Sequence, residues 1–410
     1  MKNMIILAAI ATLFSTNCQG VNRDDNEENY YKPIKLSTKS SEFVQKGNAF
    51  TFDFIERINE SEVKDYVISP LSMQFLLGMI LDSAKGTTAD EICKVLGYGK
   101  GEIDAVNEYC LSMLEQLPNL DKKTKLQIAS AIFVDDGWPL LDSYKKAVAK
   151  YYQAEVSNLN FSDNETSLKA INGWCDKHTN GMIPKILDQV DPNMLAYLLN
   201  AMYFKSQWEH QFSKKATEDE DFTDAKGAKS KLPMMKQERS FEYTENDVFQ
   251  AVELPYGNGA FSMIVLLPKG KNSVSDIAAF LKKSSLDEIR ARLYPHEVNL
   301  WLPKFETKYH IRLNDILIKM GMPSAFNTQK ADFKAMSEHA LALDFVQQDA
   351  VIKVDEEGSE AAVVSSAGMM KATAVAPGPY AIFHADHPFL YLITESSTGA
   401  VLFAGRYSGQ

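Results

Sequence analysis

The spacing of apolar side chains predicts helices in the first half of the chain. Apolar residues recur at helical spacing from Ser41 to about Ile58. A second apolar helix is predicted over Leu71 to Leu81, directly after the start signal Ser69-Pro70. Helical spacing then continues through roughly Asn193, so the first half of the chain is expected to be mainly helical.

The pattern changes to that of strands in the second half. Two apolar runs, Ala251 to Leu254 and Phe261 to Leu267, flank the glycine-containing turn 256–259 and predict a hairpin. Strands are also predicted over Val298 to Leu302 and over a closing pair, Phe389 to Ile393 and Val401 to Ala404. Because no internal repeat or proline-rich linker divides the chain, we expect one large α+β domain.

The amino-acid composition and net charge limit the classes of function that the protein can have. The 410 residues are 45% apolar, which is typical of a folded protein and excludes a disordered one. Acidic residues outnumber basic ones by 54 to 43, giving a net charge of -11. Binding a polyanion requires clustered positive charge, so a nucleic-acid partner is disfavoured.

The first 17 residues have the pattern of a signal peptide. Lys2 is followed by an apolar run from Met4 to Phe14, which is too short to span a bilayer. Cys18 then stands where bacterial lipoproteins carry their lipid, although Asn17 replaces the usual small residue, so cleavage without lipidation is the alternative. Residues 18–40 include an acidic stretch that resembles a surface-export tether, with a plain disordered leader as the other interpretation.

Metal, disulfide and enzyme signals are weak. The three remaining cysteines, Cys93, Cys110 and Cys175, are widely spaced and are predicted to be buried free thiols. His384 and His387 lack a third metal ligand nearby. The chain has no Gly-x-Ser-x-Gly elbow and no phosphate-binding loop. We therefore predict no catalytic residue, no metal site and no cofactor.

One segment near the C-terminus, residues 356–383, is too long for an ordinary connection between strands. Its first half, Gly358 to Gly368, has small, β-compatible side chains and one charge, so it could join a sheet as a strand. Pro377 and Pro379 prevent the second half from doing so.

Here the residues resemble a known family. Glu356 to Ala362 resembles the hinge of the reactive-centre loop of inhibitory serpins, and Ala385 to Leu390 resembles the segment that follows that loop. Further motifs stand in the family's order along nearly the whole mature chain: Ile68–Ser72, Ala84–Thr88, Asn200–Lys205 with Trp208, Val252–Tyr256, Leu302–Phe305 and Ala331–Phe333.

The resemblance implies a fold and a mechanism. The fold has three β-sheets, about nine helices and an exposed reactive-centre loop, here within a single domain of residues 41–410. A target protease would cleave the loop and form an acyl-enzyme, after which the freed segment would insert as a strand in the central sheet. About 14 inserted residues at roughly 3.3 Å each make a strand of about 46 Å, long enough to carry the protease most of the way across the domain.

The resemblance assigns the hinge to nine residues: Glu356, Glu357, Gly358, Ser359, Glu360, Ala361, Ala362, Val363 and Val364. Alternate side chains of an inserted strand are buried, and counting from Ser359 the buried set is small or apolar: Ser359, Ala361, Val363, Ser365 and Ala367. Glu360 falls on the other face. This composition favours an inhibitor over a non-inhibitory relative.

The family register places the cleaved bond between Ala372 and Thr373, where a small residue suits an elastase-like protease. A trypsin-like protease could instead cleave between Lys371 and Ala372, with an inserted strand one residue shorter. Both assignments stay open at the level of the sequence.

Supporting residues follow from the same resemblance. Glu356 would pair with Lys304 at the point where the loop inserts, and Trp208 would pack beneath them. Ser69, Ser72 and Asn200 match a polar cluster under the central sheet. Gln348 stands where the family often has histidine; it is expected to bond Asn200 and cannot titrate near neutral pH. We therefore expect no step in the inhibition rate near pH 6.5 from opening of this sheet.

The sequence therefore predicts a monomeric inhibitor that traps serine proteases, with cysteine proteases as a second target class. It is expected to be exported and held at a bacterial cell surface by a lipid at Cys18, or released to the extracellular space. The competing hypothesis is a non-inhibitory serpin that acts as a binding or chaperone-like surface protein.

Overall fold

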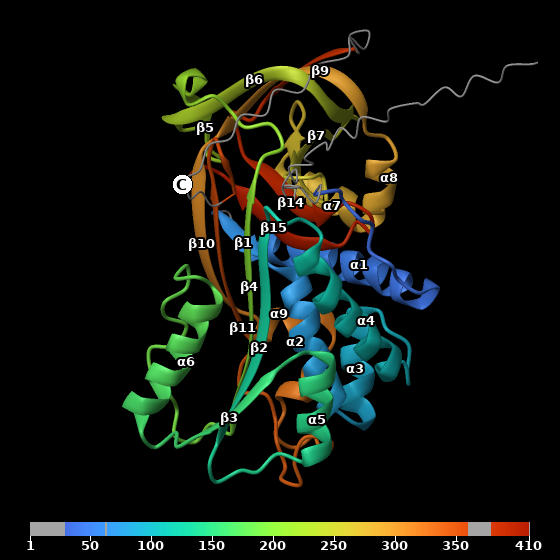
Figure 1. Cartoon of the computed structure of the whole chain (residues 1–410), viewed down its shortest axis with the longest axis vertical. Coiled ribbons are helices and arrows are strands. Elements are labelled where there is room, and N and C mark those ends of the chain that lie inside the picture. Colours follow the sequence, from blue (N-terminus) through green and yellow to red (C-terminus); the bar gives the residue numbers. More distant parts are fainter. Residues whose placement is uncertain (1–28, 62–63, 360–378, 410) are drawn as a thin grey trace, which may run out of the picture.

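A computed structural model describes residues 29–61, 64–359 and 379–409. The helices of these residues lie mostly in the first half of the chain, with α7 to α9 between later strands (Figure 1). Their bounds are α1 Thr38–Ser61, α2 Pro70–Ser83, α3 Gly86–Leu96, α4 Ile103–Gln116, α5 Asp142–Tyr151, α6 Asn164–His178, α7 Val274–Lys283, α8 Leu286–Arg290 and α9 Asn314–Met320.

The strands form one six-stranded and one nine-stranded hydrogen-bonded arrangement. Their bounds are β1 Tyr66–Ile68, β2 Lys125–Asp135, β3 Glu155–Leu159, β4 Ala196–Gln207, β5 Glu218–Thr223, β6 Lys229–Glu245, β7 Phe249–Tyr256, β8 Phe261–Pro268, β9 Tyr294–Pro303, β10 Phe305–Arg312, β11 Gln347–Val354, β12 Gly358–Ser359, β13 Tyr380–His384, β14 Phe389–Glu395 and β15 Val401–Tyr407.

The six-stranded sheet runs along the length of the molecule in the order β10-β11-β12-β4-β2-β3 (Figure 1). Its two central long strands, β11 and β4, are joined through β12, which is two residues long. Within the described part of the chain, β4 pairs with β12 only at Ser206 and Gln207, whereas it pairs with β2 over ten positions. Among the described residues, no strand lies between β11 and β4 beyond Ser359, and we call this stretch the gap.

The nine-stranded arrangement is bent around one long strand. The 17-residue β6 pairs with β9 over Met234 to Tyr243 and with β7 over Glu242 to Glu245. Two of the three sheets that the family resemblance implies are therefore continuous through β6. The edge strand β13 pairs in parallel with β9.

Helices cover both faces of the six-stranded sheet. The apolar α2 is buried along nearly its whole length behind the sheet, and it begins at the cap residue Ser69, whose hydroxyl accepts from the Ser72 N–H. On the opposite face, α6 covers a smaller apolar cluster that includes Trp174 and Tyr197 (Figure 1). The connection after α6 is tied to β11 because the Gln347 amide donates to the Ile186 carbonyl (3.0 Å).

The predicted hairpin is confirmed as β7 and β8, and the predicted closing pair as β14 and β15. The helical prediction through Asn193 is wrong for β2 and β3. The burial pattern of β2 explains the error: it is packed on both faces, so its apolar residues do not alternate with polar ones.

Residues 29–37, which the sequence assigns to the tether, lie against the domain. The Tyr31 hydroxyl donates to the buried Glu395 carboxylate (2.7 Å), Ile34 is buried, and α1 begins at Thr38 rather than Ser41. In the described ranges no helix is both long and apolar enough to cross a membrane. Those ranges also hold no group of three histidine, cysteine or acidic side chains placed to bind a metal.

Candidate functional site

A tight turn at the end of β11 begins the predicted hinge. The Asp355 N–H donates to the Gly358 carbonyl, and the Asp355 carboxylate accepts from the Glu357 N–H, both at 2.9 Å. The Trp208 N–H donates to the Glu357 carbonyl from the neighbouring segment (2.9 Å). The chain therefore reverses at residues 355–358 and runs back into the six-stranded sheet.

The two residues of β12 occupy the first positions of the gap in that sheet. Ser359 pairs with Val354 of β11 on one side and with Ser206 of β4 on the other. Its side chain points inward: the residue is 1% exposed, and its hydroxyl shares a 2.6 Å hydrogen bond with the Tyr256 hydroxyl. A Cβ on Gly358 would overlap the backbone oxygen of Ser206, so this approach requires glycine.

The Glu356 carboxylate is buried beside the turn and fully paired. Lys304 Nζ lies 2.8 Å from one carboxylate oxygen, and the Thr217 hydroxyl donates to the other (2.8 Å). Burial alone would raise the pKa of Glu356, but hydrogen bonds from Lys304, from its own backbone and from Thr217 outweigh burial, so the pKa lies below its ordinary 4.5. The structure thus brings Lys304 and Glu356 together, as the resemblance implies.

This lowered pKa gives a pH-dependent prediction. Because the folded-state pKa lies below 4.5, the ionised carboxylate contributes stability that is fully present above pH 4.5 and is lost as pH falls through the folded pKa. We expect urea unfolding to show Glu356→Gln less stable than the wild type at pH 7, with the difference shrinking below pH 4.5. A constant difference between pH 7 and pH 4 would contradict this.

A control for this series is Glu357→Gln. The Glu357 carboxylate pairs with Lys214 (2.6 Å), whose side chain is 66% exposed. Pairs with a solvent-exposed partner contribute about 0 to 1 kcal/mol, so this variant should change the unfolding free energy little at pH 7.

Trp208 lies directly beneath the hinge. It is 3% exposed, its ring stacks on Tyr256 with centroids 4.4 Å apart, and its indole Nε1–H donates to the Asp355 carbonyl (2.9 Å). The sequence predicted a role at this site for Trp208, but not for Tyr256, Thr217 or Asp355. Tyr256 appeared only within a hairpin turn and the family motif Val252–Tyr256, with no role assigned to it, and no sequence signal marked Thr217.

The predicted polar cluster lies on both sides of the gap. The Gln348 amide pairs with the backbone of Ser69, accepting from its N–H (3.0 Å) and donating to its carbonyl (2.9 Å). Asn200 on β4 accepts from the Ser72 hydroxyl and donates to the Ser130 hydroxyl (2.8 Å). The expected bond between Gln348 and Asn200 is therefore wrong, because Ser69 already satisfies both polar atoms of the Gln348 amide.

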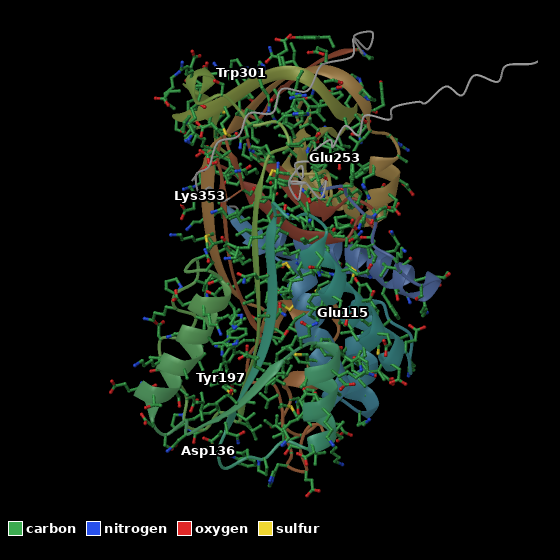
Figure 2. All side chains as sticks on the ribbon, in the orientation of Figure 1. Glu115, Asp136, Tyr197, Glu253, Trp301 and Lys353 are labelled. Carbon is green, nitrogen blue, oxygen red and sulfur yellow. The ribbon has the colours of Figure 1, made fainter. Side chains whose placement is uncertain are left out.

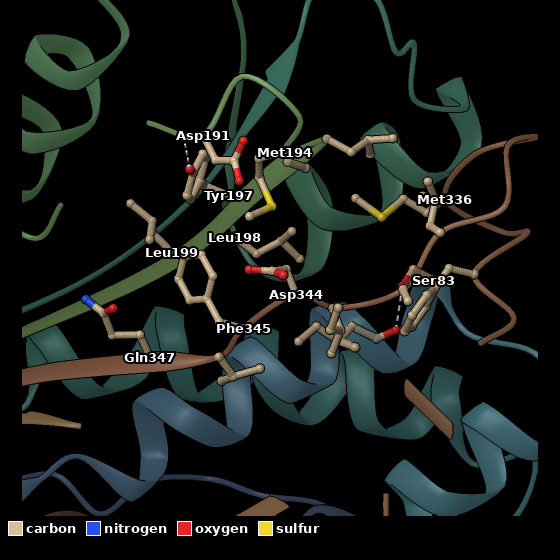
Figure 3. Close-up of a pocket in the computed structure, with 18 of the residues that line it drawn as sticks. Ser83, Asp191, Met194, Tyr197, Leu198, Leu199, Met336, Asp344, Phe345 and Gln347 are labelled. Carbon is tan, nitrogen blue, oxygen red and sulfur yellow. Dashed lines mark hydrogen bonds between the residues drawn. The ribbon is translucent and has the colours of Figure 1, made fainter. Parts of the chain in front are cut away.

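A cavity of about 360 Å³ lies at the far end of the gap (Figure 3). Figure 3 shows Leu198 and Leu199 of β4 on one side, and Asp344 and Phe345, just before β11, on the other. The lining is mostly apolar and continues onto α2. The gap between the described strands therefore ends at this cavity.

Several predicted site residues lie outside the described residues: Cys18, Glu360, Ala361, Ala362, Val363, Val364, Lys371, Ala372 and Thr373. The prediction of buried free thiols is confirmed for Cys93, Cys110 and Cys175. Burial raises the pKa of all three, to about 12 for Cys110 and Cys175, so they are poor nucleophiles.

The described residues form an α+β protein whose central sheet holds only the short β12 between β11 and β4, and comparisons with known proteins agree on its class. The family model "Serpin (serine protease inhibitor)" matches residues 45–409. Serpin B6 of Pongo abelii is 32% identical over 378 residues, covering 89% of this chain and 98% of that one. Antichymotrypsin-2 of Bombyx mori is 31% identical, covering 86% and 94%.

Solved structures give the same result. The native thermophilic serpin tengpin superposes with a TM-score of 0.82 at 28% identity, covering 93% of this chain and 97% of that one. Thyroxine-binding globulin in complex with thyroxine gives a TM-score of 0.79 at 26% identity, covering 89% and 98%. The chain belongs to the serpin family.

Proposed function

We propose that this serpin is an irreversible suicide-substrate inhibitor of serine proteases, with cysteine proteases as a second target class. The main evidence for the proposal is the position of β12. Gly358 and Ser359 already sit between β11 and β4, with a small neutral side chain turned into the core. A further strand can extend from this start without a bulky or charged residue having to be buried first.

The register of β12 fixes where such a strand would run. Continued in the same register, Ser366 would lie beside Leu199 of β4 and Gln347 of β11. Ala372 would lie beside Asn193 and Leu341, both of which line the cavity at the end of the gap. The inserted segment would therefore fill the space that the structure leaves open.

Charge supports the same register. Glu360 would face outward between Lys205 of β4 and Lys353 of β11. Neither lysine has an ion pair among the residues that the structure describes. Opposite charges on directly adjacent strands stabilise a sheet, so the first inserted charge would be favourable.

The proposed reaction uses the protease's own chemistry. Its active-site serine attacks the carbonyl carbon of Ala372, or of Lys371 in the alternative register, forming an ester and releasing the amine of the next residue. Insertion of the freed strand then moves the ester by up to about 46 Å before water can hydrolyse it. The serpin itself supplies no catalytic group.

The direct test is to mix the mature protein with pancreatic elastase and, separately, with trypsin, and to analyse the products on denaturing gels. We expect a covalent band at the summed mass of the two proteins less that of a released C-terminal peptide, which starts at Thr373 or Ala372. Mass spectrometry of that peptide fixes the bond. Complete cleavage without a covalent band, for every protease tried, would show that the loop is only a substrate.

That second outcome would support a non-inhibitory serpin, a binding or chaperone-like surface protein. The similarity to thyroxine-binding globulin, solved with thyroxine, shows that this fold also serves as a binding protein. The small, inward-facing Ser359 favours inhibition.

We further propose export and lipid attachment at Cys18, with release to the extracellular space as the alternative. The support is the sequence pattern of residues 1–18, an apolar run followed by cysteine. Metabolic labelling with a palmitate analogue should mark the wild type and not Cys18→Ala; equal labelling would contradict lipidation at this residue.

A further inference from the structure

A buried carboxylate that has no part in the reaction proposed above lies near the hinge. Asp121, between α4 and β2, is 3% exposed, and the hydrogen-bond donors that reach its side chain within the described ranges are all neutral. They include the Asn29 amide (2.6 Å), the Lys123 N–H (2.9 Å) and the Thr124 hydroxyl (2.7 Å). A buried charge is tolerated only when it is hydrogen-bonded, so these donors fix the position of the Asp121 carboxylate.

A row of hydroxyl side chains connects Asp121 to the first inserted position. The Thr124 and Ser206 hydroxyls share a 2.6 Å hydrogen bond, and Ser206 of β4 pairs with Ser359 of β12. Because a carboxylate oxygen only accepts, the Thr124 hydroxyl donates its one proton to Asp121, so the Ser206 hydroxyl must donate to Thr124. All four side chains are buried. The row therefore fixes the Ser206 side chain directly beside the hinge.

Asp121 also contacts the turn between β7 and β8. The Asn258 N–H donates to the Asp121 carboxylate (3.4 Å). A Cβ on Gly257 would overlap that carboxylate, and Gly257 has a positive φ of 51°, so this close approach requires glycine. The turn follows Tyr256, whose hydroxyl bonds the Ser359 hydroxyl. Ser359 is therefore connected to Asp121 by two routes, one through β4 and one through Tyr256.

The N-terminal segment supplies one of the donors to Asp121. Asn29 donates to the carboxylate and accepts from the Lys122 N–H (3.0 Å), so its amide has a fixed orientation. Further along the segment, Lys35 and Gln116 of α4 exchange two hydrogen bonds (2.9 and 3.1 Å). The N-terminal segment is therefore bound to the domain on both sides of the Asp121 site.

We infer that Asp121 is a positioning residue for strand insertion, and that Asn29 holds its carboxylate in place. The inference rests on the proposed function and deepens it, because it assigns the residues that keep Ser359 in β12 before the rest of the strand follows. If these contacts break, β12 leaves the sheet more often, and more acyl-enzyme is hydrolysed before it is trapped. We call the residues involved the Asp121 network: Asn29, Asp121, Thr124, Ser206 and Asn258.

The test combines two variants with a measurement that requires no protease. Asn29→Ala removes the donor from the N-terminal segment, and Thr124→Val removes the hydroxyl between Asp121 and β4. Hydrogen exchange of the uncleaved protein, read by mass spectrometry, reports how often β12 opens. We expect exchange of residues 355–359, and of the Trp208 N–H that donates to the Glu357 carbonyl, to become about tenfold faster in both variants. The number of serpin molecules consumed per protease inhibited should rise with it.

The matched control is Thr88→Val. Thr88 is also buried, and its hydroxyl accepts from the Asp332 N–H (3.0 Å), but it lies in α3, which packs against α1 and α2. It should lower the urea midpoint while changing exchange of residues 355–359 by less than about twofold. Glu115→Gln is a second control, because this exposed carboxylate on α4 carries the same charge as Asp121 outside the network (Figure 2).

A reciprocal exchange of the two side chains tests the coupling directly. Asp121→Asn alone places two amide groups against each other and should behave like Thr124→Val. Asn29→Asp with Asp121→Asn lets the same bond form in the opposite direction, so exchange should return toward the wild-type rate.

The inference is overturned if the network variants and Thr88→Val change exchange of residues 355–359 alike, or if the double variant is no better than Asp121→Asn alone. Faster exchange in the network variants, together with no covalent complex between the wild type and any protease, would refute the proposed function. The role of Asp121 in holding β12 would still stand.

Discussion

If the protein inhibits proteases as proposed, Ser359→Arg is expected to convert it into a substrate. The Ser359 side chain is 1% exposed and bonds the Tyr256 hydroxyl (2.6 Å), so a guanidinium at this position would have to be buried without a charge partner. Insertion would stall at its first residue, leaving time for hydrolysis of the acyl-enzyme. In a titration against elastase or trypsin, we expect the number of serpin molecules consumed per protease inhibited to rise about tenfold or more.

The control for this prediction is Ser359→Thr, which keeps a small side chain and the hydroxyl. It should inhibit with the wild-type stoichiometry. Circular dichroism of Ser359→Arg should match the wild type, because β12 is only two residues long and its loss would remove little strand structure. Full inhibition by Ser359→Arg would show that this residue is not buried during trapping.

Trp208→Ala should cause the largest loss of stability. Trp208 is 3% exposed, stacks on Tyr256 and donates to the Asp355 carbonyl, so its removal opens a cavity and leaves a buried acceptor unpaired. Truncation of a buried tryptophan costs about 3–5 kcal/mol. We expect the urea midpoint of the native state to fall accordingly, with faster spontaneous loss of inhibitory activity on storage.

Trp138→Ala is the matched comparison. Trp138 is 38% exposed, and its ring contacts His339 edge-on. Surface substitutions of this kind change the unfolding free energy by less than about 1 kcal/mol. Equal losses for the two variants would mean that the hinge does not depend on packing from Trp208.

The sequence predicted the antiparallel hairpins better than the six-stranded sheet. β7 and β8 are consecutive and joined by a glycine-containing turn, so local signals suffice. In β4, β2 and β11, by contrast, the neighbours are distant in sequence, and β2 has a continuous buried run in place of alternation. Only the family resemblance predicted that these segments form one sheet with a vacant position.

Some contacts of the candidate site could also be predicted from the sequence, and others could not. The pairing of Lys304 with Glu356 could be predicted from the resemblance. Once a buried carboxylate and a lysine lie close together, few other partners are available to either side chain. The partner of Gln348 could not be predicted, since an amide can bond any nearby donor or acceptor and the backbone N–H and carbonyl of Ser69 lie within reach. Thr217 was missed because its role depends on where β5 begins relative to the hinge.

The bond from Gln347 to the Ile186 carbonyl ties the connection after α6 across the gap that a new strand would occupy. A strand inserted in the proposed register would place Ser366 beside Gln347, so we expect insertion to break this bond, whether the strand comes from a cleaved loop, an intact loop or another molecule. Under the proposed function, this hydrogen bond therefore raises the free-energy barrier to strand insertion. The same barrier would lengthen both the lifetime of the active native state and the time for which the acyl-enzyme waits before it is trapped. With a weaker hydrogen bond here, the protein would trap proteases faster, and its active native state would have a shorter lifetime.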